Sequence, residues 1–150
     1  MKFLVDTNII IRTIEIESDL SQQVTEAIEY LLRKEHQLYI VPQNLIEFWN
    51  VYTRPKSKNS FGYSPDEANQ EIQYLKTFFD LIPDTEEIYD QWERLVNDYK
   101  VSGVQVHDAR LVATMKVHQL SHILTYNSKD FNRYAKEIVV LHPQDISSLY

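Results

Sequence analysis

The sequence contains no cysteine, which excludes a disulfide framework, a thiolate nucleophile and a thiolate metal site. It also lacks any apolar run close to the roughly 18 residues that a membrane-spanning helix needs. A cleavable secretion signal is not expected, because Lys2 is a single charge and the first apolar stretch is broken at Asp6. These absences make the cytoplasm the default location.

Positive charge is also scarce, since 15 lysines and arginines stand against 22 acids and give a net charge of -7. This balance excludes a broadly basic surface for nucleic acid, although a local basic patch remains compatible with it. With 43% hydrophobic residues over 150 positions, the chain is long enough to bury one compact core. We therefore expect residues 1–150 to form a single domain.

Short apolar segments alternate with longer segments of helical periodicity. Brief apolar runs predict strands at 3–5, 38–41, 122–126 and 138–141. Helices are expected between them, at residues 7–14, 18–37, 42–53, 64–80, 84–99 and 106–120, with a last helical turn at 143–149. This alternation favours an α/β fold with a short, mostly parallel central sheet and helices on both of its faces.

Two of these helices begin at a capping signal. Ser64 precedes Pro65 and is followed by Glu67 at the third position after it, which is typical of a capping box. Asp84 and Glu87 repeat that spacing. We expect one helix to begin at each pair.

Four carboxylates lie in apolar surroundings, where solubility does not require them. Asp6 ends the first strand, and Glu47 lies in the helix after the second, within LIEFW. Asp108 is near the start of a later helix, and Asp130 follows the strand at 122–126. Because sites in open parallel sheets form at the carboxyl ends of the strands, one crevice could collect all four.

Each of these acids also has an ordinary structural explanation. Asp6 suits an Asx-turn or a helix cap, and Glu47 suits a solvated helix face. Asp108 complements the positive end of a helix dipole, and Asp130 suits a loop. None of the four is informative alone, so the case for function depends on the set.

A cluster of four acids is electrostatically costly. Two carboxylates about 4 Å apart repel by roughly 4 kcal/mol at an effective dielectric constant near 20. Four of them must raise their pKa values or move apart unless a divalent cation lies among them. Oxygen ligands without cysteine suit Mg²⁺ or Mn²⁺, and such an ion can orient water for attack on a phosphate.

The order of the motifs resembles the PIN domain, and within it the VapC-type toxins. The motifs are DTN at 6–8, a helical glutamate at 47, HDA at 107–109 and TYNSKDF at 125–131. The resemblance implies a PIN-like fold with catalytic, metal-binding acids at Asp6, Glu47, Asp108 and Asp130. It further implies polar residues that support those acids, namely Thr7, Asn8, Thr125 and Asn127.

The activity that the resemblance implies is a Mg²⁺- or Mn²⁺-dependent endoribonuclease, the toxin of a type II toxin–antitoxin pair. RNA would be the substrate, and a small VapB-like antitoxin and a second copy of the chain would be the partners. Two alternatives keep the fold: a PIN nuclease of RNA processing, or a catalytically silent module that binds metal or RNA. A phosphoacceptor receiver or a haloacid-dehalogenase-like phosphatase ranks last, because DTN supplies one acid where those proteins need two.

The one dense basic run lies in the loop at 54–64, where the sequence departs from the more compact toxins. Arg54, Lys56 and Lys58 are candidate contacts for an RNA backbone, and Arg110 is a candidate contact for a phosphate. A solvated loop explains the run equally well. His107 stands beside Asp108, but hydrolysis by two metal ions needs no histidine base.

Overall fold

The structure, a computed structural model, describes residues 1–15, 18–56 and 61–148. Within these residues five strands form one sheet in the order β3-β2-β1-β4-β5, and every neighbouring pair is parallel. The strands are β1 (Lys2–Val5), β2 (Gln37–Ile40), β3 (Asp80–Leu81), β4 (His122–Leu124) and β5 (Val139–Leu141). The predicted α/β class is confirmed, and the described sheet is parallel throughout.

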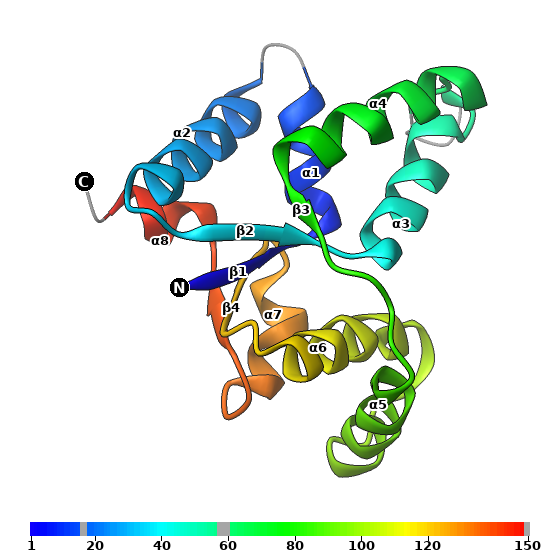
Figure 1. Cartoon of the computed structure of the whole chain (residues 1–150), viewed down its shortest axis with the longest axis vertical. Coiled ribbons are helices and arrows are strands. Elements are labelled where there is room, and N and C mark those ends of the chain that lie inside the picture. Colours follow the sequence, from blue (N-terminus) through cyan, green and yellow to red (C-terminus); the bar gives the residue numbers. More distant parts are fainter. Residues whose placement is uncertain (16–17, 57–60, 149–150) are drawn as a thin grey trace.

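Helices connect the strands and cover both faces of the sheet (Figure 1). They are α1 (Thr7–Ile14), α2 (Asp19–Arg33), α3 (Pro42–Thr53), α4 (Pro65–Phe78), α5 (Glu87–Asp98), α6 (Val106–His118), α7 (Ser128–Phe131) and α8 (Pro143–Ser147). None of the described helices combines the length and the apolar character needed to cross a membrane.

Strand β1 lies at the centre of the sheet, between β2 and β4. Its residue Leu4 pairs with Tyr39 on one side and with Ile123 on the other. Phe3, Leu4 and Val5 are all buried, as expected for a parallel strand that is covered on both faces. An uninterrupted apolar run therefore ends at the carboxyl edge of the sheet, where Asp6 follows.

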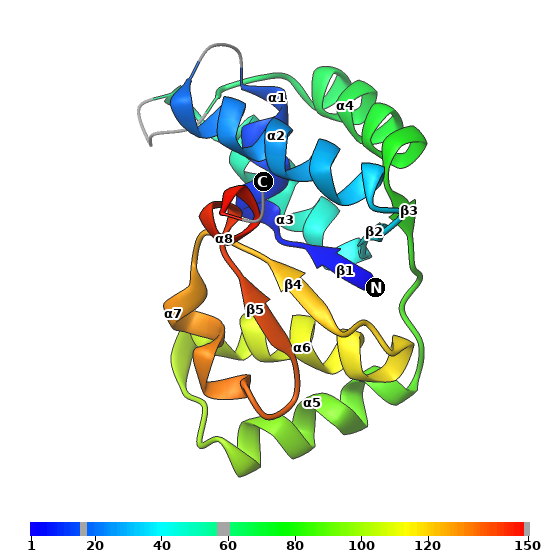
Figure 2. The ribbon, with the colours of Figure 1, turned by 90° about the vertical axis from the view of Figure 1, so that its left-hand side faces the viewer.

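The two faces of the sheet have separate cores. Phe3 and Val5 pack with α1, α2, α3, α4 and α8, whereas Leu4 packs with α5 and α6. Figure 2 shows α5 and α6 together below the sheet and the other long helices above it. Because side chains alternate between the two faces along β1, this one strand contributes residues to both cores.

One of the two capping predictions is confirmed and the other is wrong. Ser64 Oγ accepts from the Glu67 N–H at 3.1 Å, while the Ser64 N–H donates to Glu67 Oε1 at 3.3 Å, so α4 begins with a capping box. Helix α5 begins at Glu87 without a side-chain cap. Asp84 instead forms an ion pair with Arg110 of α6, at 3.3 Å, so a tertiary contact has replaced the local one.

Two short elements were not predicted. Strand β3 has two exposed residues, and pairing with β2 rather than apolar character places it at the sheet edge. Helix α7 is a single turn inside the segment that the sequence analysis left without regular structure. Strand β4 ends at Leu124, two residues earlier than expected, which leaves Thr125 and Tyr126 in the connection that enters the site.

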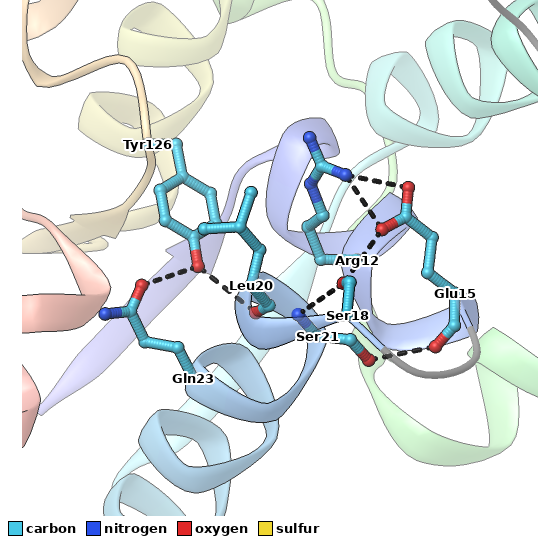
Figure 3. A network of polar contacts seen from close by, with 7 residues as sticks. All are labelled: Arg12, Glu15, Ser18, Leu20, Ser21, Gln23 and Tyr126. Atoms are coloured by element: carbon cyan, nitrogen blue, oxygen red, sulfur yellow. Dashed lines mark hydrogen bonds and ion pairs between the residues drawn. The ribbon is translucent and has the colours of Figure 1, made fainter.

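Polar contacts join the end of α1, the start of α2 and the segment after β4 (Figure 3). Arg12 Nη1 lies 2.8 Å from each carboxylate oxygen of Glu15, and Ser18 Oγ donates to Glu15 Oε2 at 3.4 Å. On the other side of α2, the Tyr126 hydroxyl donates to Gln23 Oε1 at 2.8 Å. The first set of contacts ties the end of α1 to the start of α2, and the Tyr126 hydroxyl holds the segment after β4 against α2.

Candidate functional site

Asp6 is both the last residue before α1 and the first polar group beyond β1. Its N–H donates to the carbonyl of Leu124 at 3.0 Å, which extends the sheet pairing by one residue. Its Oδ1 accepts from the Thr7 N–H at 2.8 Å, so the capping explanation is correct. Only 5% of the residue is exposed. A surface cap needs no such burial, so capping alone does not account for Asp6.

The second oxygen of Asp6 is held by one residue from the segment after β4 and by one from the first turn of α1. The Thr125 hydroxyl donates to Asp6 Oδ2 at 2.7 Å, and Asn8 Nδ2 donates to the same atom at 3.2 Å. Thr125 is itself fixed, because its Oγ1 accepts from the Asn127 N–H at 2.9 Å. The structure thus brings Thr125 and Asn8 onto Asp6, while Asn127 contributes through its backbone.

Glu47 lies on α3, and both of its carboxylate oxygens accept hydrogen bonds. Thr7 Oγ1 donates to Glu47 Oε2 at 2.8 Å, and Gln43 Nε2 donates to Oε1 at 2.8 Å. The Thr7 hydroxyl in turn accepts from Asn44 Nδ2 at 3.2 Å. Thr7 therefore links Asp6 to Glu47, because its N–H donates to the first carboxylate and its hydroxyl donates to the second.

Gln43 and Asn44 belong to this network, although the sequence analysis did not single them out. Both are buried, and Asn44 Oδ1 accepts from the Val41 N–H at 2.9 Å, which caps the start of α3. A signal was present, since two amide residues stand in the first turn of a helix whose following residues are apolar. Buried amides of this kind need fixed partners, and here the partners are Thr7 and Glu47.

Gln43 also connects the site to α6. Its Nε2 lies 2.8 Å from the carbonyl oxygen of His107, and its Oε1 accepts from Arg110 Nη1 at 3.2 Å. Arg110 bridges onward to Asp84. The start of α6, which carries Asp108, is thereby held beside α3.

The charge on Asp6 is disfavoured by its surroundings. Burial raises the pKa of its carboxyl from the usual 3.8 to about 6, against the hydrogen bonds from Thr125 and Thr7, which lower it. The negative charges of Glu47 and Asp130 raise it further. Asp6 is therefore close enough to two more of the predicted acids to feel their charge.

Asp108 feels the charge of all three other acids. Burial raises its pKa from 3.8 to about 7, and repulsion from Asp6, Asp130 and Glu47 acts in the same direction. Arg133, which the sequence analysis did not single out, lowers it. The four predicted acids thus form one electrostatic group, although they come from four segments of the chain.

The chemistry of this group fits a hard divalent cation. Its donors are carboxylate, hydroxyl and amide oxygens, and their mutual repulsion is what a bound cation would relieve. Among the described residues, no three acidic or histidine side chains are placed so that they could hold a metal ion as they stand. Mg²⁺ does not require three, because it keeps several waters and is commonly bound through one or two carboxylates.

The predicted basic contacts separate into two sets. Arg110 lies beside the acids through its bond to Gln43, whereas Arg54 follows Glu47 by seven residues, about 10 Å along the helix axis. The Arg54 Nε is buried and has no hydrogen-bond partner among the described residues, and Lys56 is exposed. Lys58 lies outside the described residues.

Comparison with solved structures finds the same fold in proteins whose sequences differ widely from this one, and three of them illustrate the likeness. A chain of VapBC2 from Rickettsia felis, bound to promoter DNA, is similar with a TM-score of 0.71 and 16% identity, over 95% of this chain and 98% of that one. A chain of VapBC-1 from nontypeable Haemophilus influenzae gives 0.70 and 19%, over 96% and 99%. VapC20 from Mycobacterium tuberculosis, a toxin that cleaves the sarcin–ricin loop, gives 0.63 and 14%, over 91% and 96%.

Comparison with curated proteins finds no match. The sequence does match the family model of the PIN domain, over residues 3–137. That span begins in β1 and ends just before β5, so it contains all four acids and the side chains that hold them. The chain belongs to the PIN domain family.

Proposed function

We propose that the protein is a Mg²⁺- or Mn²⁺-dependent endoribonuclease and the toxin of a type II toxin–antitoxin pair acting in the cytoplasm. The observation that carries this proposal is the electrostatic group of Asp6, Glu47, Asp108 and Asp130 at the carboxyl edge of the sheet. A cation bound there would supply a reactive water and offset the charge that develops on the leaving oxygen. Residues 1–150 would form one nuclease domain.

The chain's own residues would orient the acids for this task. Thr125 and the Thr7 N–H fix both oxygens of Asp6, and Thr7 and Gln43 fix both oxygens of Glu47. Hydrogen bonds of this kind orient ligating carboxylates and are commonly as necessary as the ligands themselves. Asp108 and Asp130 complete the group from α6 and α7.

The proposed partners rest on the similar structures. The similar structures include a toxin–antitoxin complex from Klebsiella pneumoniae, and VapBC2 of Rickettsia felis was solved bound to a fragment of its promoter DNA. A small VapB-like antitoxin and a homodimer are accordingly proposed for this chain. An open reading frame for a short DNA-binding protein beside this gene, and co-purification of its product with the chain, would test the antitoxin proposal.

The activity is tested by cleavage of end-labelled single-stranded RNA with the purified chain. We expect cleavage with Mn²⁺ or Mg²⁺, none with EDTA, and none with Asp6→Asn. The matched control is Asp66→Asn, which removes an exposed acid from the first turn of α4. RNA that is bound but never cut would identify a silent binding module and overturn the proposal.

A further inference from the structure

A hollow lies beside the acidic group, between the start of α5 and the start of α6. Its volume is about 490 Å³, and its walls include Tyr89 and Trp92 of α5 and His107 and Arg110 of α6. Pockets that bind small organic molecules have volumes of roughly 300–1,000 Å³. The hollow is therefore large enough for one nucleotide unit.

Two aromatic rings line this hollow, one of them accessible to solvent and the other held in place by a hydrogen bond. Tyr89 is 60% exposed, and its ring centroid lies 5.7 Å from that of Trp92. Trp92 Nε1 donates to the carbonyl of Val106 at 2.9 Å, which fixes the indole against the start of α6. Exposed rings held in this way are the surfaces on which unpaired bases stack.

The hollow is physically continuous with the acidic group. Gln43 donates to Glu47 in that group and to the carbonyl of His107 in the wall of the hollow, both at 2.8 Å. Its amide oxygen accepts from Arg110, which lines the hollow. Gln43 thus lies between the two sites and contacts both of them. An RNA strand with a phosphate at the acids would reach the hollow with the next nucleotide.

The charges at the rim favour the base of that unit over its phosphate. Arg110 is already paired with Asp84, and Glu86 is a further acid in the wall. With Arg110 and Asp84 offsetting each other, Glu86 leaves this rim with a net negative charge that repels a phosphate, whereas a neutral base gains stacking area and can donate to a carboxylate.

We propose that this hollow binds one unpaired base of a single-stranded RNA, next to the phosphodiester that is cut. The inference deepens the proposed nuclease function and rests on it. Tyr89 is the stacking surface, Trp92 supports it, and Arg110 is a positioning residue that holds Gln43 between the two sites.

The test compares two tyrosines that are equally exposed but lie on different helices. Tyr89 is 60% exposed in the hollow, and Tyr74 of α4 is 61% exposed on the opposite side of the sheet. Short single-stranded RNA carrying 2-aminopurine is titrated, with Mg²⁺ present, into Asp6→Asn protein so that the RNA is not cut. Tyr89→Ala, Tyr89→Phe and Tyr74→Ala are each added to that background, and the same three are assayed for cleavage in the otherwise unchanged protein.

We expect Tyr89→Ala to weaken RNA binding about tenfold and to lose most of the 2-aminopurine quenching, because base stacking is removed. KM should rise by a similar factor with kcat less affected, while Tyr89→Phe and Tyr74→Ala stay near the starting protein. Equal binding by Tyr89→Ala and Tyr74→Ala overturns the inference, even if RNA is cleaved. A change of oligomeric state in Tyr89→Ala alone overturns it too, because the hollow is then an interface between copies. If no RNA is cleaved, the nuclease function fails while the binding comparison still decides the fate of the hollow.

Discussion

The two walls of the acidic group are built differently. At the end of β1, Asp6 is almost fully buried, but Thr7 and Thr125 donate hydrogen bonds to its carboxylate. On α6, Asp108 is more exposed, yet its pKa is raised further, to about 7 against about 6. In the described part of the chain, only burial and neighbouring charges act on Asp108.

Burial is the largest cause of the raised pKa at both acids, and hydrogen bonds from Thr125 and Thr7 offset part of it at Asp6. The β1 wall is preorganised by the fold, because its donors come from the backbone and from buried side chains. Among the described residues, only the charge of Arg133 favours the ionised form of Asp108 on the α6 wall, and a bound cation would add to that support. The predictions below test that contrast.

The largest effect is expected on cleavage when either wall loses its charge. Asp6→Asn and Asp108→Asn should each reduce cleavage at least about 100-fold, since a cation contributes several kcal/mol to the transition state. Their melting temperatures should diverge in metal-free buffer at pH 8. Asp108→Asn should raise the melting temperature, because it removes an uncompensated charge. Asp6→Asn should lower it, because the new amide N–H would face the Thr7 N–H and the Thr125 hydroxyl, which are also donors. Equal shifts in the two melts would contradict the contrast.

The next effect concerns pH and metal. In the folded state Asp6 and Asp108 bind protons more tightly than at their usual pKa of 3.8. Their contribution to stability is therefore complete below about pH 4 and is lost as pH rises through about 6 to 7. For Asp6 alone the loss is roughly 3 kcal/mol.

Millimolar Mg²⁺ or Mn²⁺ should restore this stability at pH 8 and have little effect at pH 5, where protons already neutralise Asp6 and Asp108. Thermal melts at both pH values, with and without the ion, measure the two effects together. A melt that ignores the ions at pH 8 would exclude a cation among these acids.

A smaller effect is expected from the support of Asp6. Thr125→Val removes the hydroxyl that lies 2.7 Å from Asp6 Oδ2 and also accepts from Asn127. The protein should lose about 2 kcal/mol of stability at pH 8, and the pKa of Asp6 should rise further. Urea unfolding measures the first and carboxyl NMR titration the second. Thr125→Ser, which keeps the hydroxyl, should preserve most of both; loss of both with serine would assign the effect to packing.

The smallest effect is expected from Arg133, the cation that lowers the pKa of Asp108. Arg133→Gln should raise that pKa by less than about 1 pH unit, because the side chain is exposed and its charge is screened. NMR titration of the Asp108 carboxyl measures the shift. Lys136→Gln removes an exposed charge from the same stretch of chain and should leave Asp108 unchanged.

The sequence predicts those parts of the fold that depend on local patterns. Phe3–Val5 is an apolar run that ends at an acid, and Ser64 with Glu67 is a local cap, so both were visible in the order of residues. Strand β3 was not, because its two exposed residues pair only through the backbone of β2. The predicted cap at Asp84 was wrong for a similar reason, because its partner Arg110 is distant in sequence.

The candidate site divides along the same line. The four acids were predicted to lie together because Asp6, Glu47 and Asp130 come after strands whose carboxyl ends share one edge of the sheet, and because Asp108 begins a later helix. Gln43 and Asn44 could not be ranked, because their importance depends on contacts that form only when α1, α3 and α6 meet, and Arg133 could not because it acts on Asp108 from the turn after α7. A buried amide in a helix looks the same in sequence whether it caps one helix or joins two walls.

The central position of β1 makes the spacing of its first residues unusually consequential. One strand aligns Thr125 on its β4 side and Glu47, through β2 and α3, on its other side. Inserting or deleting one residue between Lys2 and Val5 would rotate every following side chain to the opposite face of the sheet. Asp6 would then lose both neighbours at once, and Phe3 and Val5 would exchange cores with Leu4. The site therefore depends on the register of β1 in the sheet as well as on the identity of the acid that follows it.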